Sequence, residues 1–342
     1  MNFVIKGSIC HSVTPKEIGI TRGYAVCENG ISRGVFETLP ERYAGLPVHD
    51  FTGKLVMPGM VDLHIHGAQF AYRGTGFDLE LLDWLDSHAF PEEARFADED
   101  YAHRAYTIFA DAMKMSATTR AAVFASRHGR ATEILMEKLE ASGIVSYVGK
   151  VNMDRDAPDP LREADADASA ADTVQWIERT QHRFSRTYPI LTPRFIPSCT
   201  DALMEKLGEI QRKYHLPIQS HVSENQGEIG LVKQLRPDAA YYGDAYDRHG
   251  LFGRNPVTGE AVPTLMAHCV WSPDAEIEKM REQSVFVVHC PASNFNVSSG
   301  IAPIRRYLEA GLKLGLGSDV AGGQSESMLR AVTDAVQMSK MY

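Results

Sequence analysis

From Lys54 onward the sequence alternates between short apolar runs and amphipathic stretches, and this alternation constrains the fold more than any other feature. Eight apolar runs have the length and composition of buried strands: "KLVMPGMVDLHIH", "RAAVFAS", "IVSYVGKVNM", "YPILTPRFIP", "LPIQSHVS", "TLMAHCV", "VFVVHCP" and "LKLGLGSD". Stretches with helical periodicity lie between them, such as "DALMEKLGEIQRKY", "DAEIEKMREQS" and "IAPIRRYLEAG". Eight strands, each followed by a helix or loop, predict an α/β fold, a (β/α)₈ TIM-type barrel over residues 58–342.

Residues 1–57 show the different pattern of short strands. The stretch "YAVCENGISRGVF" holds two apolar runs joined at Asn29-Gly30, a pair typical of tight hairpin turns. The opening "MNFVIKGSIC" lacks the basic region and the long apolar region of a signal peptide, so it predicts a strand. We therefore expect residues 1–57 to form a separate small β-structure.

Composition excludes several classes of protein. The chain of 342 residues is 44% hydrophobic and 23% charged, which is typical of a globular protein. Its net charge of −9 argues against nucleic acid or an anionic membrane as the main partner, and no apolar stretch is long enough to span a bilayer. Five scattered cysteines without a C-x-x-C pair indicate free thiols in a reducing, cytoplasmic environment.

Two histidines end the first predicted barrel strand, in "PGMVDLHIHGAQ". Side chains on a strand alternate between faces, so His64 and His66 point the same way while Ile65 points the other. At the carboxyl end of a barrel strand, where active sites of this fold lie, both imidazoles would face one point. Alone, such a pair is about as often two hydrogen-bonded polar residues as a pair of metal ligands.

Other strand ends carry side chains of the same chemical kind. His221 and Glu224 end the fifth predicted strand in "QSHVSEN", His268 ends the sixth in "MAHCVWS", and Asp319 ends the eighth in "LGSDVAGG". The ends of parallel barrel strands converge in space, so these side chains should meet the two histidines. Imidazole nitrogens and a carboxylate oxygen suit Zn²⁺, and they can also hold Fe²⁺ or Mn²⁺. The set predicts a metal site.

The same motifs resemble a known family. "PGMVDLHIHGAQ", "PRF", "HVSEN", "HCPASNFNVSSG" and "GLGSDVAGG" are similar, in this order, to the amidohydrolase superfamily and to the guanine deaminases within its mononuclear zinc branch. The resemblance extends over nearly the whole chain. The paired histidines and the aspartate of strand eight are shared across the superfamily, whereas Gln69, Arg194-Phe195 and "HVSEN" resemble guanine deaminases specifically.

The resemblance implies a role for each residue. One Zn²⁺ would be held by His64, His66, His221 and Asp319. It would lower the pKa of a bound water toward about 7. Glu224 would shuttle protons, and the catalytic set would be Glu224, His268 and Asp319. The reaction would be hydrolytic deamination of guanine to xanthine and ammonia, carried out by a cytoplasmic homodimer.

Guanine has a carbonyl beside ring nitrogens on a flat edge, and the predicted binding residues match it. Arg194 offers several fixed donors, and Gln69 offers two donors and an acceptor. Phe195 would pack near the purine face. His221 and Glu224 complete the substrate-binding set that the resemblance implies.

Other interpretations remain open. Amidohydrolases with two metals place a modified lysine at the end of strand four, but that strand carries Arg194 here, and Lys150 lies on strand three, which favours one metal. Deamination or hydrolysis of a related aminopurine or a triazine ring would use the same metal set. A non-catalytic binding or assembly protein with the same barrel is the alternative from another class.

Two segments carry further expectations. The long excursion over residues 67–96 is either a wall or lid of the site or a packing element around Trp84 and Phe90. The resemblance also implies a small β-sandwich that residues 1–57 begin and that later strands, expected to be missing from this chain, complete. The sheet of residues 1–57 would then have an unpaired edge.

Overall fold

The computed structural model describes residues 1–14 and 17–341. The chain divides into two compact units, Met1–Gly59 and Met60–Tyr342, with a boundary two residues beyond the one that the sequence suggested. Among the described residues, none of the helices combines the length and apolar character that crossing a membrane requires.

The first unit contains one four-stranded sheet in the order β3-β2-β1-β4. Its strands are β1 (Phe3–Thr14), β2 (Glu17–Glu28), β3 (Ile31–Phe36) and β4 (Val48–Val56). The expected hairpin is confirmed: Glu28 pairs with Ile31, and Asn29 and Gly30 form the turn with φ of 56° and 76°. Positive φ at both central positions is what a type I′ turn requires. That this sheet is part of a β-sandwich stays a prediction.

The second unit is built on parallel strands. They are β5 (Met60–His66), β6 (Thr118–Phe124), β7 (Val145–Gly149), β8 (Val151–Asn152), β9 (Thr187–Pro189), β10 (Thr192–Pro193), β11 (Ile218–Val222), β12 (Thr264–His268), β13 (Phe286–His289) and β14 (Lys313–Leu316). The sheets run β5-β6-β7-β9, β8-β10 and β11-β12-β13-β14.

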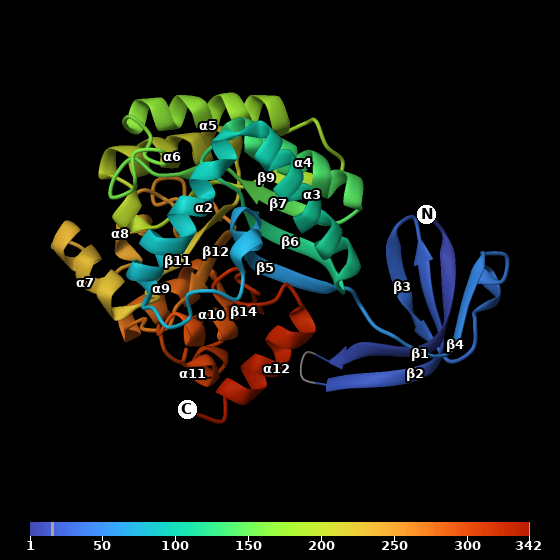
Figure 1. Cartoon of the computed structure of the whole chain (residues 1–342). Coiled ribbons are helices and arrows are strands. Elements are labelled where there is room, and N and C mark those ends of the chain that lie inside the picture. The colour runs from blue at the N-terminus through green and yellow to red at the C-terminus, as the bar shows by residue number, and fades with distance from the viewer. Residues whose placement is uncertain (15–16, 342) are drawn as a thin grey trace. The chain divides into compact units, whose positions relative to one another are not determined.

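Backbone contacts link these sheets into a ring (Figure 1). A parallel bridge between Leu191 and Ile218 joins the β9–β10 segment to β11. Next to β14, the amide of Asp319 donates to the carbonyl of His64 at 2.8 Å, and that of His66 donates to the carbonyl of Val320 at 3.0 Å. The α/β class is confirmed, and the carboxyl ends of the strands meet on one face.

Helices cover the outside of the strands (Figure 1). They are α3 (Glu99–Met115), α4 (Gly129–Ser142), α5 (Ala166–Thr180), α6 (Asp201–Tyr214), α7 (Gln226–Leu235), α8 (Asp244–Asp247), α9 (Asp274–Gln283), α10 (Pro291–Asn296), α11 (Ile304–Glu309) and α12 (Met328–Met338). Helix α6 illustrates their logic: the Thr200 hydroxyl accepts the amide of Leu203 at 3.2 Å, while Leu203, Leu207 and Ile210 enter the core.

The strand-like run "KLVMPGMVDLHIH" is divided between two strands in the structure. The residues around Pro58 lie outside any strand, so β4 ends at Val56 and β5 begins at Met60. Proline has no amide hydrogen and cannot donate within a sheet, which explains the interruption. The first half of the run belongs to the first unit and the second half to the ring of parallel strands.

The excursion over residues 67–96 folds into a series of short helices. These are η2 (Gly67–Tyr72), α1 (Leu81–Trp84), η3 (Leu85–Ala89), α2 (Phe90–Ala94) and η4 (Arg95–Ala97). Trp84 and Phe90 are buried in the main core, at 3% and 4% exposure. The packing interpretation is therefore confirmed for these two side chains.

Candidate active site

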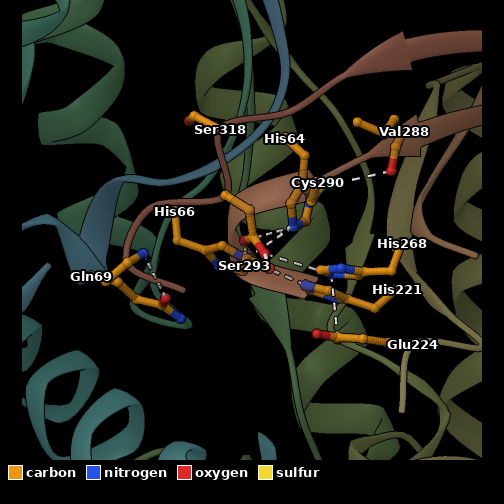
Figure 2. Close-up of polar contacts among 12 residues, drawn as sticks. His64, His66, Gln69, His221, Glu224, His268, Val288, Cys290, Ser293 and Ser318 are labelled. Atoms are coloured by element: carbon orange, nitrogen blue, oxygen red, sulfur yellow. Dashed lines mark hydrogen bonds and ion pairs between the residues drawn. The ribbon is translucent and has the colours of Figure 1, made fainter. Parts of the chain in front are cut away.

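Five of the predicted site residues converge at the carboxyl ends of the strands. Figure 2 shows the imidazoles gathered around one point: His64, His66, His221 and His268. All are buried, as is Asp319 at 6% exposure. Because β5, β11, β12 and the segment after β14 each end on the same face, residues up to 255 positions apart become neighbours.

Several pairs of the predicted ligands lie at similar short distances. His64 Nε2 lies 3.2 Å from His66 Nε2, and His66 Nε2 lies 3.3 Å from His221 Nε2. Asp319 Oδ1 lies 3.1 Å from His64 Nε2 and 3.3 Å from His66 Nε2. Two donor atoms that each lie about 2.0–2.1 Å from one metal ion are about 3 Å apart. These spacings therefore fit donors that share one metal ion such as Zn²⁺.

Neighbouring groups orient the donors. His221 donates from Nδ1 to the carbonyl of Arg194 at 2.6 Å, which leaves its Nε2 lone pair facing the other ligands. The Ser293 hydroxyl donates to Asp319 Oδ2. Burial lowers the pKa of His64 to about 4 and that of His221 well below 6.5, so both imidazoles are neutral, as metal ligands must be.

Asp62, which the sequence analysis did not single out, ties two ligand-bearing segments together. Its Oδ1 accepts the amides of His64 at 3.2 Å and Ser318 at 3.0 Å, and its Oδ2 accepts the Ser318 hydroxyl at 2.5 Å. Asp62 is fully buried, so these bonds form in a low-dielectric environment. They hold His64 and Asp319 beside each other.

Cys290 offers a competing donor. Its Sγ and one ligand atom each of His64, His268 and Asp319 lie within 4.8 Å of one another. Burial raises the pKa of the Cys290 thiol well above 9.0, which opposes the thiolate form that binds metals. The histidine-rich set therefore fits a metal better, in line with the prediction that no cysteine is a ligand.

Glu224 and His268 lie next to the donor set. His268 Nε2 is 3.3 Å from Glu224 Oε2 and 3.7 Å from Asp319 Oδ2, and its Nδ1 donates to Asn294 Oδ1 at 2.8 Å. Burial and the charge of Asp319 raise the pKa of Glu224 well above 4.5. A carboxyl group with a raised pKa can both take up and release a proton near neutral pH.

The backbone is strained at two of these residues, His268 and Asp319. His268 has a φ of 74° and Asp319 a φ of 47°, in the left-handed region that favours glycine. Side chains held this way occur preferentially at functional sites, where the surrounding structure compensates for the strain.

A cavity opens beside the donor set. Gln69, Arg194 and Phe195, the predicted substrate-binding residues, line it together with His221 and Glu224. The structure thus brings together every residue that the sequence analysis assigned to the site.

Part of the 67–96 excursion also lines this cavity. Leu81, Trp84 and Leu85 form its apolar wall opposite the metal donors. The interpretation as a wall of the site is therefore confirmed as well, since Trp84 contributes both to the core and to the cavity.

Glu93 is a further residue of the site that sequence reasoning missed. Its Oε1 accepts from Gln69 Nε2 at 2.8 Å, and its Oε2 accepts from Arg194 Nη1 at 2.5 Å. In the sequence "FPEEARF" nothing distinguishes Glu93 from Glu92. Only the path of the excursion shows which of the two carboxylates reaches the site.

Comparison with known proteins agrees with this geometry. Residues 55–342 match the Amidohydrolase family.

This chain belongs to the amidohydrolase family.

Within the amidohydrolase family, its relatives are guanine deaminases, which confirms the resemblance seen in the sequence. It is 39% identical to the guanine deaminase of Dictyostelium discoideum over 86% of this chain and 64% of that protein. It is 40% identical to that of Rattus norvegicus over 83% of this chain and 61% of that protein. The chain thus spans less than two thirds of the length of these relatives.

A solved amidohydrolase structure is similar over the whole of this chain. The crystal structure of guanine deaminase from C. acetobutylicum, with bound guanine in its active site, has 42% sequence identity and a TM-score of 0.95. The similarity covers 100% of this chain and 80% of that chain.

Lys150 bears on the number of metals in this amidohydrolase. Its Nζ lies 2.5 Å from Glu163 Oε1 and 3.3 Å from Asp172 Oδ2, and its side chain is fully buried. Because Lys150 forms ion pairs with both carboxylates, its role is structural. This supports the expectation of a single metal.

Proposed function

We propose that this chain catalyses the zinc-dependent hydrolytic deamination of guanine to xanthine and ammonia. One observation carries the proposal: the convergent donor set, Glu224 and the Gln69–Arg194 pair all face the same cavity. The names of the relatives and the guanine bound in the C. acetobutylicum structure support guanine as the substrate.

The proposed metal ligands are His64, His66, His221 and Asp319. When bound there, Zn²⁺ would activate water as a nucleophile at neutral pH. Glu224 accepts a proton from the attacking water and passes it to a ring nitrogen, which makes the amino-bearing carbon more electrophilic. The remaining proton of the added hydroxyl then passes to the amino group, with Glu224 or Asp319 as the relay. The C–N bond breaks, ammonia leaves and the new carbonyl of xanthine forms. His268, 3.3 Å from Glu224 and 3.7 Å from Asp319, stabilises the charge that develops between the two carboxylates.

The proposed substrate contacts come from the wall of the cavity. Arg194 donates to the carbonyl and a ring nitrogen of the base, and Gln69 pairs with its amidine-like edge. The Phe195 ring, edge-on to His221 with centroids 6.5 Å apart, packs beside the purine face. Leu81 and Trp84 exclude water from the opposite side.

The alternative functions lack a supporting observation of this kind. A non-catalytic binding or assembly role does not account for four convergent metal donors beside a carboxyl group with a raised pKa. A related aminopurine or a triazine ring stays an alternative substrate that a substrate panel tests. A homodimer and a cytoplasmic location also stay predictions.

The decisive experiment measures xanthine formation from guanine by the purified chain with zinc present. Robust turnover supports the proposal. A folded, zinc-loaded chain that leaves guanine unchanged but deaminates another ring in the panel would identify a different substrate.

Metal removal gives a second expected outcome. We expect about one zinc per chain, and a chelator should abolish turnover and lower the melting temperature, because a ligand that binds only the folded state stabilises it. Added Zn²⁺ should restore both. Turnover that persists after the zinc content has fallen to zero would contradict a metal-dependent reaction.

A further inference from the structure

Glu93 contacts both residues that the proposed function assigns to base recognition, yet it does not line the cavity. It lies on α2, its side chain is 1% exposed, and each of its carboxylate oxygens accepts from one partner. The Arg194 side chain is 4% exposed, so Glu93 neutralises a guanidinium group that is almost fully removed from water.

The contacts determine the orientation of the Gln69 amide. Its Nε2 donates to Glu93, and its Oε1 accepts the amide of Ala321 at 3.3 Å. A flipped amide would set Oε1 against the Glu93 carboxylate and Nε2 against the Ala321 amide. The first contact would set two acceptors against each other and the second would set two donors against each other, so only one orientation of the amide is stable.

Fixing the amide determines what remains for a substrate. Gln69 keeps one free N–H, and Arg194 keeps the guanidinium N–H groups that Glu93 does not use. This wall of the cavity therefore presents donors in a fixed arrangement. A ring carbonyl accepts from the free Arg194 N–H groups, and a ring nitrogen of the amidine-like edge accepts from the free Gln69 N–H. A ring with an amino group in place of the carbonyl sets donor against donor.

We propose that Glu93 is a positioning residue for substrate selection: by holding Gln69 and Arg194 as a fixed donor pair, it makes the cavity favour a purine with a carbonyl facing Arg194 over one with an amino group at that position. This inference rests on the proposed function. Glu93 does not line the cavity. It acts through its hydrogen bonds to Gln69 and Arg194 and contacts no reacting atom.

The test compares guanine with 2,6-diaminopurine, which carries an amino group where guanine has its carbonyl. In Glu93→Gln, the new side chain satisfies one partner but turns its own NH₂ toward the other, so the donor pair loses its fixed arrangement. We expect KM for guanine to rise about 10- to 100-fold with a smaller change in kcat. The preference for guanine over 2,6-diaminopurine in kcat/KM should narrow about tenfold or more.

Glu92→Gln is the matched control. Glu92 is the neighbouring residue on α2, but its carboxylate accepts from Arg95 Nη1 at 2.9 Å and from the Tyr101 hydroxyl, and contacts neither Gln69 nor Arg194. This variant removes the same charge from the same helix, so it reports any general weakening of α2. We expect its KM and its preference for guanine to match the unmodified chain.

A second variant addresses folding. Glu93→Asp keeps the charge, but its side chain is one methylene shorter and cannot reach both partners. It should therefore also narrow the preference for guanine over 2,6-diaminopurine.

A double variant tests whether Glu93 acts through Gln69. If it does, the Gln69→Ala background should remove much of the effect of Glu93→Gln. Zinc content is expected to be unchanged throughout.

The outcomes separate the two proposals. No guanine turnover by the unmodified chain overturns the proposed function and this inference with it. Turnover by the unmodified chain with an unaltered preference in Glu93→Gln and Glu93→Asp overturns the inference alone. Equal losses in Glu93→Gln and Glu92→Gln would also overturn it, because they would indicate a purely structural role.

Discussion

The Glu224→Gln variant is expected to retain zinc and bind guanine but to lose about 10²–10⁴-fold in kcat. Glutamine has nearly the shape of glutamate and can still accept from Ser299 Oγ, which lies 3.3 Å from Glu224 Oε1. It cannot take up or release a proton at neutral pH. Because Glu224 is not one of the four proposed metal ligands, zinc content should not change.

Steady-state kinetics and metal analysis on the same preparation check this prediction. The comparison that matters is kcat per bound zinc, since it separates chemistry from metal loading. Near-native turnover in Glu224→Gln would assign the proton transfer to another group, with His268 and Asp319 as the neighbouring candidates.

Asp319→Asn is expected to produce the other large loss, through the metal itself. The replacement removes the only carboxylate among the four donors, whereas burial lowers the pKa of His64 and His221 and keeps these two imidazoles neutral. We expect zinc affinity to fall by more than about 10- to 100-fold, the loss typical of residues that only support a ligand. Turnover should fall with it.

Dialysis against a metal buffer, followed by metal analysis, measures this affinity directly. Glu224→Gln serves as the control, since it changes a buried carboxylate of the same cavity without touching the donor set. If Asp319→Asn kept full zinc at low free metal, Asp319 would not be a ligand, and the proposed donor set would be wrong.

Some residues of this site could be predicted from the sequence and others could not. The convergence of the candidate donors follows from two local rules: alternation along β5 puts His64 and His66 on one face, and parallel strands present their carboxyl ends together. Which of the converging side chains would hold the metal was implied only by the family resemblance. These residues were predictable because their positions depend on secondary structure and not on side-chain packing.

The contacts of Glu93 and Asp62 were not predictable in this way. Glu93 lies in a chain of short helices whose path is set by burial of Trp84 and Phe90, and no periodicity in the sequence encodes that path. Asp62 meets Ser318 from the far end of the chain. Both carboxylates acquire their partners only when distant segments pack together.

The sequence by itself therefore determined the α/β class, the strand ends and the donor chemistry of this protein, because each depends on short-range patterns. The tertiary structure alone decided two things: the short distances between the donors, and the choice of Glu93 over Glu92 as the partner of Gln69 and Arg194. Distances between side chains far apart in sequence are set by the packing of whole elements, which no local pattern specifies.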